Sequence, residues 1–199
     1  SFNRKVNIMT KNFIKQIQQK WAEGKFVCVG LDPVWDKLPK HLLKQQQFHG
    51  DPDVIYDFCI AIVQKTQDIA CAYKPNAAFF EAFGANGWVA LQRVCDYINA
   101  YTDVPIIYDA KRGDINNTNE GYVTAAFDKL QAGAITVHPT MGSVAMKPFM
   151  DRADRGTVVL CKTSNDGSGQ SQNQTLMGSG QRMYAYVAEA VSSEWQYNN

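Results

Sequence analysis

The sequence predicts an α/β protein built around a parallel β-sheet, and three observations support this prediction. Short, nearly continuous apolar runs recur along the chain, which is typical of strands buried on both faces. Stretches with apolar residues at three- and four-residue spacing separate these runs and indicate amphipathic helices. Each run ends in polar residues, and parallel α/β folds place their functional sites at the carboxyl ends of the strands. The pattern fits a (β/α)8 barrel or an open doubly wound sheet.

Five strands are expected, one in each apolar run. The runs are KFVCVGLDP (25–33), IACAYKPNAAFFE (69–81), VPIIYDAKRGD (104–114), AITVHPTMG (134–142) and TVVLCKTSNDGSG (157–169). Helices are expected between them, for example over 51–67 and 86–102, and a last helix over 180–195. The longest expected loop covers residues 165–180, and its length indicates a functional or mobile segment.

Composition and charge narrow the class of protein. The chain has 199 residues, 45% of them hydrophobic and 20% charged, with a net charge of +1, which is typical of a globular domain. This near-neutral net charge does not indicate a basic surface that would bind nucleic acid or an anionic membrane. No apolar run approaches the roughly 20 residues that span a bilayer, and the N-terminus lacks a secretory signal. Five cysteines without a CxxC pair favour a reducing, cytoplasmic compartment over a disulfide framework or zinc site.

A cluster of opposite charges ends the third apolar run, in PIIYDAKRGDINNT. Side chains in a strand alternate between its faces, so Asp109 and Lys111 are expected to project in the same direction. Lys74 ends the preceding apolar run, and its side chain is expected to point toward the same carboxyl end of the sheet. With Asp114, which follows just past the turn that Gly113 permits, they form an alternating Lys–Asp–Lys–Asp array.

The alternative for this array is a salt-bridge network that only closes the end of the sheet. Buried ion pairs are poor stabilisers compared with apolar packing, because desolvation roughly cancels the Coulomb gain. Four such groups at the carboxyl ends of parallel strands therefore favour catalysis, through tuned pKa values and transition-state electrostatics.

The segment DAKRGDINNT resembles the Asp-x-Lys-x-x-Asp signature of the orotidine 5′-phosphate decarboxylase family. VGLDP, YKPNAAFFE and VVLCKTSNDGSGQ resemble further blocks of that family's longer-looped bacterial branch, in order from about Phe13 onward. The signature alone is shared with magnesium-dependent sugar-phosphate decarboxylases and aldolases, but four blocks in register favour the first family. The resemblance implies a (β/α)8 barrel, of which this chain holds the first five βα units. We expect an N-terminal extension over 1–12 and, over 13–199, the N-terminal five-eighths of a single barrel domain.

The resemblance also implies a reaction: conversion of orotidine monophosphate to uridine monophosphate and CO2 in de novo pyrimidine biosynthesis, without metal or organic cofactor. By matching position, the Lys111 ammonium would stabilise and then protonate the C6 carbanion. Asp109 would lie near the substrate carboxylate, and Lys74 and Asp114 would hold this pair in position.

Further residues are expected to bind the substrate. By the same resemblance, Asp32 would bind the ribose and Ser164 the pyrimidine edge, whereas Asp114, Ile115 and Thr118 would reach into the neighbouring subunit's site and make the enzyme a homodimer. Two alternatives are open: Asp32 as a turn residue before a proline, and Thr118 as a helix N-cap. His138 is expected to be structural.

The resemblance has a consequence for the chain taken alone. Phosphate in such barrels is bound by the loops after strands seven and eight, beyond the five units expected here. The 199 residues alone are therefore expected to be inactive. The alternative functions are a magnesium-dependent sugar-phosphate enzyme and a non-catalytic fragment or assembly module.

Overall fold

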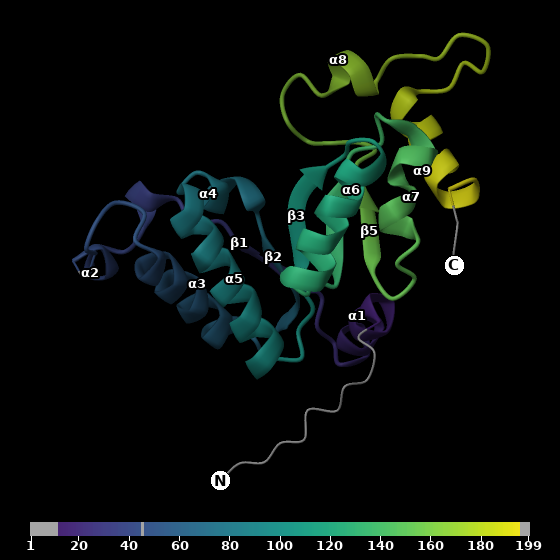
Figure 1. Ribbon diagram of the computed structural model, residues 1–199. Coiled ribbons are helices and arrows are strands. Elements are labelled where there is room, and N and C mark those ends of the chain that lie inside the picture. Colours follow the sequence, from purple (N-terminus) through teal and green to yellow (C-terminus); the bar gives the residue numbers. More distant parts are fainter. Residues whose placement is uncertain (1–11, 45, 196–199) are drawn as a thin grey trace.

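The computed structural model describes residues 12–44 and 46–195 as parallel strands that alternate with helices (Figure 1). The strands are β1 (Val27–Leu31), β2 (Ala70–Pro75), β3 (Ile107–Arg112), β4 (Ala134–Val137) and β5 (Gly156–Val159). Each strand falls within one residue of an expected apolar run or inside it. The expected extension over 1–12 lies outside the described residues except for Asn12, the N-cap of the first helix, and stays a prediction.

Helices follow each strand, and the longer ones occur where the apolar spacing predicts them. They are α1 (Phe13–Ala22), α2 (Lys40–Leu43), α3 (Pro52–Thr66), α4 (Ala77–Glu81), α5 (Gly84–Tyr101), α6 (Asn116–Val123), α7 (Gly142–Met150), α8 (Gly169–Gln172) and α9 (Met183–Ser193), with a 3-10 turn η1 (Trp35–Lys37) and a π-helix η2 (Thr124–Lys129). At the start of α3, Pro52 needs no amide partner and the Asp51 side chain accepts the N–H of Asp53. None of the described helices is long and apolar enough to cross a membrane.

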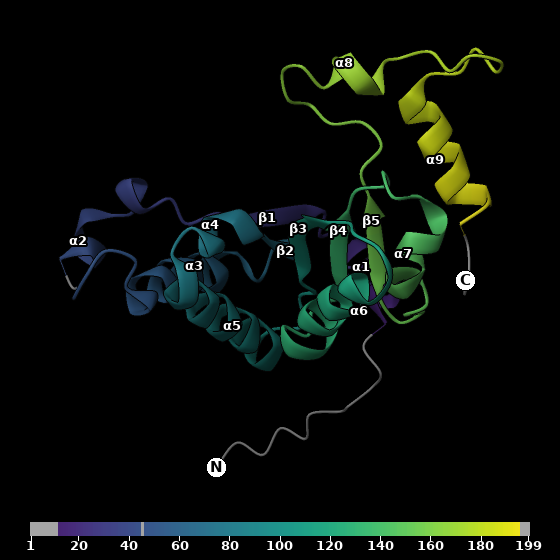
Figure 2. The ribbon, with the colours of Figure 1, turned by 45° about the horizontal axis from the view of Figure 1, so that its top comes forward.

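The strands lie side by side in the order of the sequence. β1 pairs with β2, and β4 pairs with both β3 and β5, all in parallel. Isolated parallel bridges, Tyr73 to Ile106 and Asn76 to Asp109, connect β2 to β3. A doubly wound sheet reverses its strand order at a switch point, and no reversal occurs here (Figure 2). The chain therefore forms five βα units of a (β/α)8 barrel.

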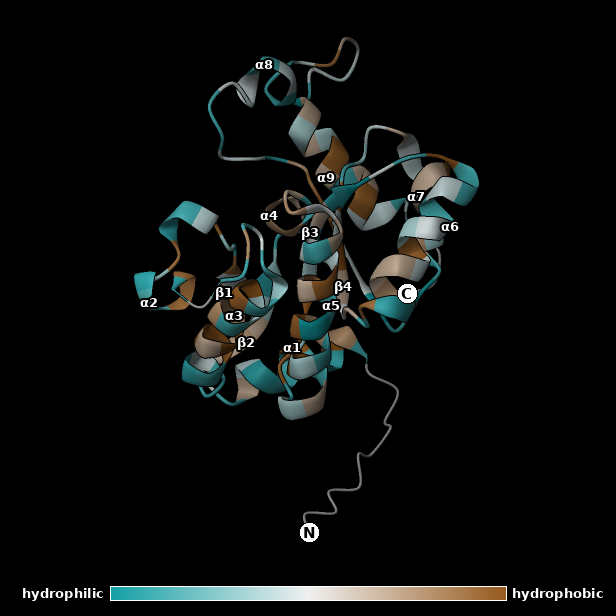
Figure 3. Ribbon diagram, turned by 60° about the vertical axis from the view of Figure 1, so that its left-hand side comes forward, coloured by the Kyte–Doolittle hydropathy of each residue, from teal (hydrophilic) through white to brown (hydrophobic). Residues whose placement is uncertain are grey.

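The main core lies between the sheet and the helices that cover it. Its largest fully buried side chains include Tyr73, Phe80, Leu91, Ile98, Phe127 and Phe149. Figure 3 shows hydrophobic and hydrophilic residues interleaved along α3 and α5, as expected for helices with one face on a sheet. A smaller cluster forms where α1 packs against the strands, and there Phe13 contacts the start of β5 so closely that a Cβ on Gly156 would lie 2.5 Å from its ring. Packing thus leaves the opposite, carboxyl end of the strands for the site.

Gly87 in α5 is expected to be essential for packing against α4. A Cβ added there would lie 1.7 Å from the carbonyl oxygen of Phe80, which belongs to the backbone and cannot rotate away. Gly87→Ala should therefore lower the free energy of unfolding by about 2–4 kcal/mol, measured by urea denaturation of the complete protein. Gly121→Ala in α6 is the matched control, because nothing lies within 4 Å of its added Cβ. Equal stability of the two variants would contradict the close packing.

Candidate active site

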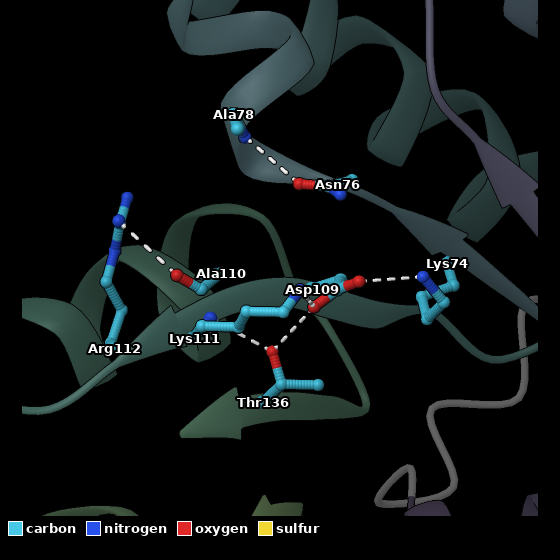
Figure 4. Close-up of polar contacts among 8 residues, drawn as sticks. All are labelled: Lys74, Asn76, Ala78, Asp109, Ala110, Lys111, Arg112 and Thr136. Carbon is cyan, nitrogen blue, oxygen red and sulfur yellow. Dashed lines mark hydrogen bonds and ion pairs between the residues drawn. The ribbon is translucent and has the colours of Figure 1, made fainter. Parts of the chain in front are cut away.

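Three of the expected charged residues meet at the carboxyl ends of β2 and β3. Lys74 Nζ lies 2.7 Å from Asp109 Oδ2, and Lys111 Nζ lies 2.6 Å from Asp109 Oδ1 (Figure 4). The Asp109 side chain is only 8% exposed, whereas those of Lys74 and Lys111 are 34% and 49% exposed. Asp109 and Lys111 project to the same side of β3, as strand alternation predicts. One buried carboxylate therefore holds two ammonium groups that still face the open end of the sheet.

Thr136 of β4 completes this network, and the sequence analysis did not single it out. Its hydroxyl donates a hydrogen bond to Asp109 Oδ1 at 2.9 Å and accepts one from the backbone N–H of Lys111 at 3.0 Å. The signal in the sequence is weak, because threonine is common in strands for its β-branched shape alone.

The environment separates the pKa values of the clustered groups. Burial raises the pKa of Asp109, but hydrogen bonds from Lys111, Lys74 and Thr136 outweigh burial and hold this pKa below its ordinary value. Burial lowers the pKa of Lys74, but its hydrogen bond to Asp109 and the negative charges of Asp109 and Asp32 together outweigh burial, so its pKa is raised. Partial desolvation raises the pKa of Asp32, which feels the charges of both lysines and Asp109. Asp109 is thus kept ionised and Lys74 protonated.

Replacing Asp109 tests this charge state through stability. Its lowered folded pKa contributes stability that is fully present above the ordinary carboxyl pKa of about 4 and is lost as the pH falls through the folded value. Asp109→Asn should therefore be less stable than the wild type at pH 7, and the difference should shrink as the pH falls below about 4. Urea denaturation of both proteins across this range measures it. A difference that is independent of pH would contradict an ionised Asp109.

Asp114 lies apart from these three residues in the same chain. Its carboxylate accepts the N–H of Ile115 at 2.7 Å, and within the described part of the chain it forms no ion pair with Lys74 or Lys111. Asn119, fully buried, holds this loop by bonds to the backbone N–H and carbonyl of Asp114 and to the carbonyl of Ala145. The array expected from the sequence is therefore made by three residues of this chain and not by four.

The remaining expected residues occupy the same end of the sheet. Asp32 directly follows β1, and Ser164 lies exposed in the loop after β5. Ile115 and Thr118 are exposed at the start of α6. The N-cap alternative for Thr118 is wrong, because α6 begins at Asn116 and Thr118 is its third residue.

Backbone geometry around the cluster differs from expectation. Gly113 does not adopt a positive φ; a Cβ there would instead lie 2.7 Å from the His138 ring, so close approach is what requires glycine. The positive φ of 48° falls on Lys111 itself. The Nδ1 of His138 is buried and has no hydrogen-bond partner among the described residues, so the structural role expected for this histidine stays a prediction.

Among the described side chains, no group of three or more His, Cys, Asp or Glu residues converges in a way that could hold a metal ion. The charged side chains of the site are instead arranged around one carboxylate, where they can act on a developing negative charge directly.

Comparison with known proteins shows which family the chain belongs to. Residues 25–195 match the model of the orotidine 5′-phosphate decarboxylase / HUMPS family. The chain belongs to this family. It is 46% identical over 170 residues to the orotidine 5′-phosphate decarboxylase of Roseiflexus sp. strain RS-1, covering 85% of this chain and 59% of that protein. It is 42% identical over 188 residues to that of Janthinobacterium sp. strain Marseille, covering 94% and 66%.

A solved structure of the family confirms the barrel. The Leishmania donovani OMP decarboxylase superposes with a TM-score of 0.80 at 38% identity, over 94% of this chain and 67% of that one. The chain therefore has the fold of this family over part of the (β/α)8 barrel, and it spans about 59–66% of the length of the curated relatives it matches.

Proposed function

We propose that the complete protein converts orotidine 5′-phosphate to uridine 5′-phosphate and CO2, without a metal or organic cofactor, in pyrimidine biosynthesis. The observation that carries this proposal is the buried Asp109 carboxylate held between the ammonium groups of Lys74 and Lys111. The names of the relatives support orotidine 5′-phosphate as the substrate, since each relative is named orotidine 5′-phosphate decarboxylase.

The chemistry explains why such a cluster suits this reaction. Loss of CO2 from the pyrimidine leaves a carbanion at C6 with no adjacent electron sink. Only preorganised charge and a ready proton can stabilise this anion, and the Lys111 ammonium supplies both. Asp109 lies beside Lys111, where its charge would repel the substrate carboxylate and not the neutral CO2 that leaves. Lys74 binds the other oxygen of Asp109 and so fixes the direction of the pair.

Two further residues are proposed to bind the substrate. Asp32 directly follows β1 at the carboxyl end of the sheet, near Lys74 and Asp109, and a carboxylate there can accept hydrogen bonds from the ribose hydroxyls. Ser164 carries an exposed hydroxyl after β5, and a hydroxyl can both donate to and accept from a pyrimidine imide.

The protein is proposed to act as a homodimer with shared sites. Within the described residues Asp114 makes no ion pair with Lys74 or Lys111, while Ile115, 52% exposed, and Thr118 lie beside it on the surface at the start of α6. These three residues would complete the site of a second copy. A cytoplasmic, reducing location is supported by the five cysteines, all of which are free thiols.

The test is an assay of the complete protein, including any residues that continue the chain, with orotidine 5′-phosphate in the presence of EDTA. Loss of pyrimidine absorbance is the expected result. Activity that disappears with EDTA and returns with magnesium on a sugar phosphate would favour the related sugar-phosphate enzymes. Tight binding of the nucleotide without turnover would favour a non-catalytic module.

A further inference from the structure

The strand that carries Asp109 and Lys111 is bulged at these residues. Tyr108 pairs with Ile135 and Arg112 pairs with Val137, so three residues of β3 face the single Thr136 of β4. Lys111, inside the bulge, has a φ of 48°, a left-handed conformation that is unfavourable for a residue with a side chain. Bulges next to active sites re-aim side chains, and this one sets two oppositely charged groups side by side.

Thr136 fills the gap that the bulge opens. Its hydroxyl accepts the N–H of Lys111 at 3.0 Å, a donor that the interrupted ladder leaves without a strand partner. The same hydroxyl donates to Asp109 Oδ1 at 2.9 Å, the oxygen that also binds Lys111 Nζ. Figure 4 shows Thr136 facing both residues from the neighbouring strand.

The surroundings indicate that this hydroxyl has a specific task. Thr136 is 6% exposed, and the other residues of β4 are apolar and buried. A buried hydroxyl is unfavourable unless it is hydrogen-bonded, and here both of its bonds go to the two residues of the proposed chemistry.

We propose that Thr136 is a positioning residue, which pins the bulge so that the Lys111 ammonium and the Asp109 carboxylate keep their relative orientation. This inference rests on the proposed function. Thr136 touches neither the substrate nor the reacting atoms in this assignment. It acts through the backbone of Lys111 and through one oxygen of Asp109.

Kinetics of Thr136→Val and Thr136→Ser in the complete protein test the assignment. Valine keeps the shape and removes the hydroxyl, so kcat should fall about 10- to 100-fold with KM changed by less than about threefold. Serine keeps the hydroxyl and should retain kcat within about threefold. Thr157→Val is the matched control: Thr157 pairs with Ile135 and so lies on the helix-facing side of the sheet. An equal loss in the valine and serine variants, or a loss in KM alone, would overturn the proposal.

A second readout does not depend on turnover. Carbon-13 NMR of the Asp109 carboxyl, in the absence of substrate, should show a higher pKa in Thr136→Val than in the wild type and little change in Thr136→Ser. If the wild type does not convert orotidine 5′-phosphate, the proposed function fails and this titration still decides the role of Thr136. If the wild type is active and both readouts are unchanged in Thr136→Val, the positioning role alone fails. Should Thr136→Val not fold, Thr136→Cys, with its weak donor, takes its place in both comparisons.

Discussion

The Lys111→Ala variant of the complete protein should lose about 10⁴- to 10⁷-fold of its kcat/KM for orotidine 5′-phosphate, the product of an electrostatic contribution of about 10²–10³ and a proton-transfer contribution of about 10²–10⁴. The loss is this large because one ammonium group serves both steps. Lys111 lies 2.6 Å from Asp109 and remains 49% exposed, so it is fixed in direction yet open to a substrate.

Two controls make this result interpretable. Lys129→Ala removes a lysine that is exposed at the end of η2, just before the amino end of β4 and so at the opposite end of the strands from the cluster, and it should leave kcat/KM unchanged. Nucleotide binding by Lys111→Ala, measured by calorimetry with uridine 5′-phosphate, should weaken far less than kcat falls, since the lost interaction belongs to the transition state. A variant that retains a tenth of wild-type kcat/KM would contradict the role of Lys111.

Mixing two inactive variants should restore activity if sites are shared between subunits. Lys74→Ala removes a residue of the charged cluster, which one chain supplies. Asp114→Asn removes a residue that is proposed to come from the other copy. In random heterodimers one site carries both substitutions and the other carries none, so a 1:1 mixture after subunit exchange should reach about a quarter of wild-type activity. Steady-state assays before and after exchange measure this recovery.

The matched control uses two substitutions that both fall in the charged cluster of one chain. Lys74→Ala mixed with Asp109→Asn should recover nothing, because both residues belong to one chain's cluster, 2.7 Å apart. If the Lys74→Ala and Asp114→Asn mixture also recovers nothing although exchange is complete, Asp114 does not serve the neighbouring site.

The charged cluster could be predicted from the sequence because it depends on two local rules. Strand alternation predicts Asp109 and Lys111 on one side, although in the structure a bulge also sets this pair, and parallel pairing brings the end of the preceding strand, with Lys74, to the same edge. Both rules operate over a few residues and need no knowledge of packing. The strands were predictable for the same reason, since buried parallel strands read as apolar runs.

The support around the cluster could not be predicted, because it depends on contacts between strands and on backbone strain. Thr136 reads as an ordinary strand residue until the bulge opposite it is known. Gly113 reads as a turn glycine, whereas the approach of His138 is what excludes a side chain there. The start of α6 at Asn116, two residues before Thr118, likewise depends on the buried Asn119, which binds the loop from within the helix.

The central claim is that the Lys111 ammonium stabilises and protonates a carbanion at C6. The reverse of that protonation is removal of the C6 proton of uridine 5′-phosphate, so exchange of this hydrogen in D2O, followed by proton NMR, tests the claim most directly. The complete wild-type protein should catalyse the exchange, and Lys111→Ala, at saturating nucleotide, should not exceed the background rate. Equal exchange by the two proteins would show that the carbanion is handled by another group.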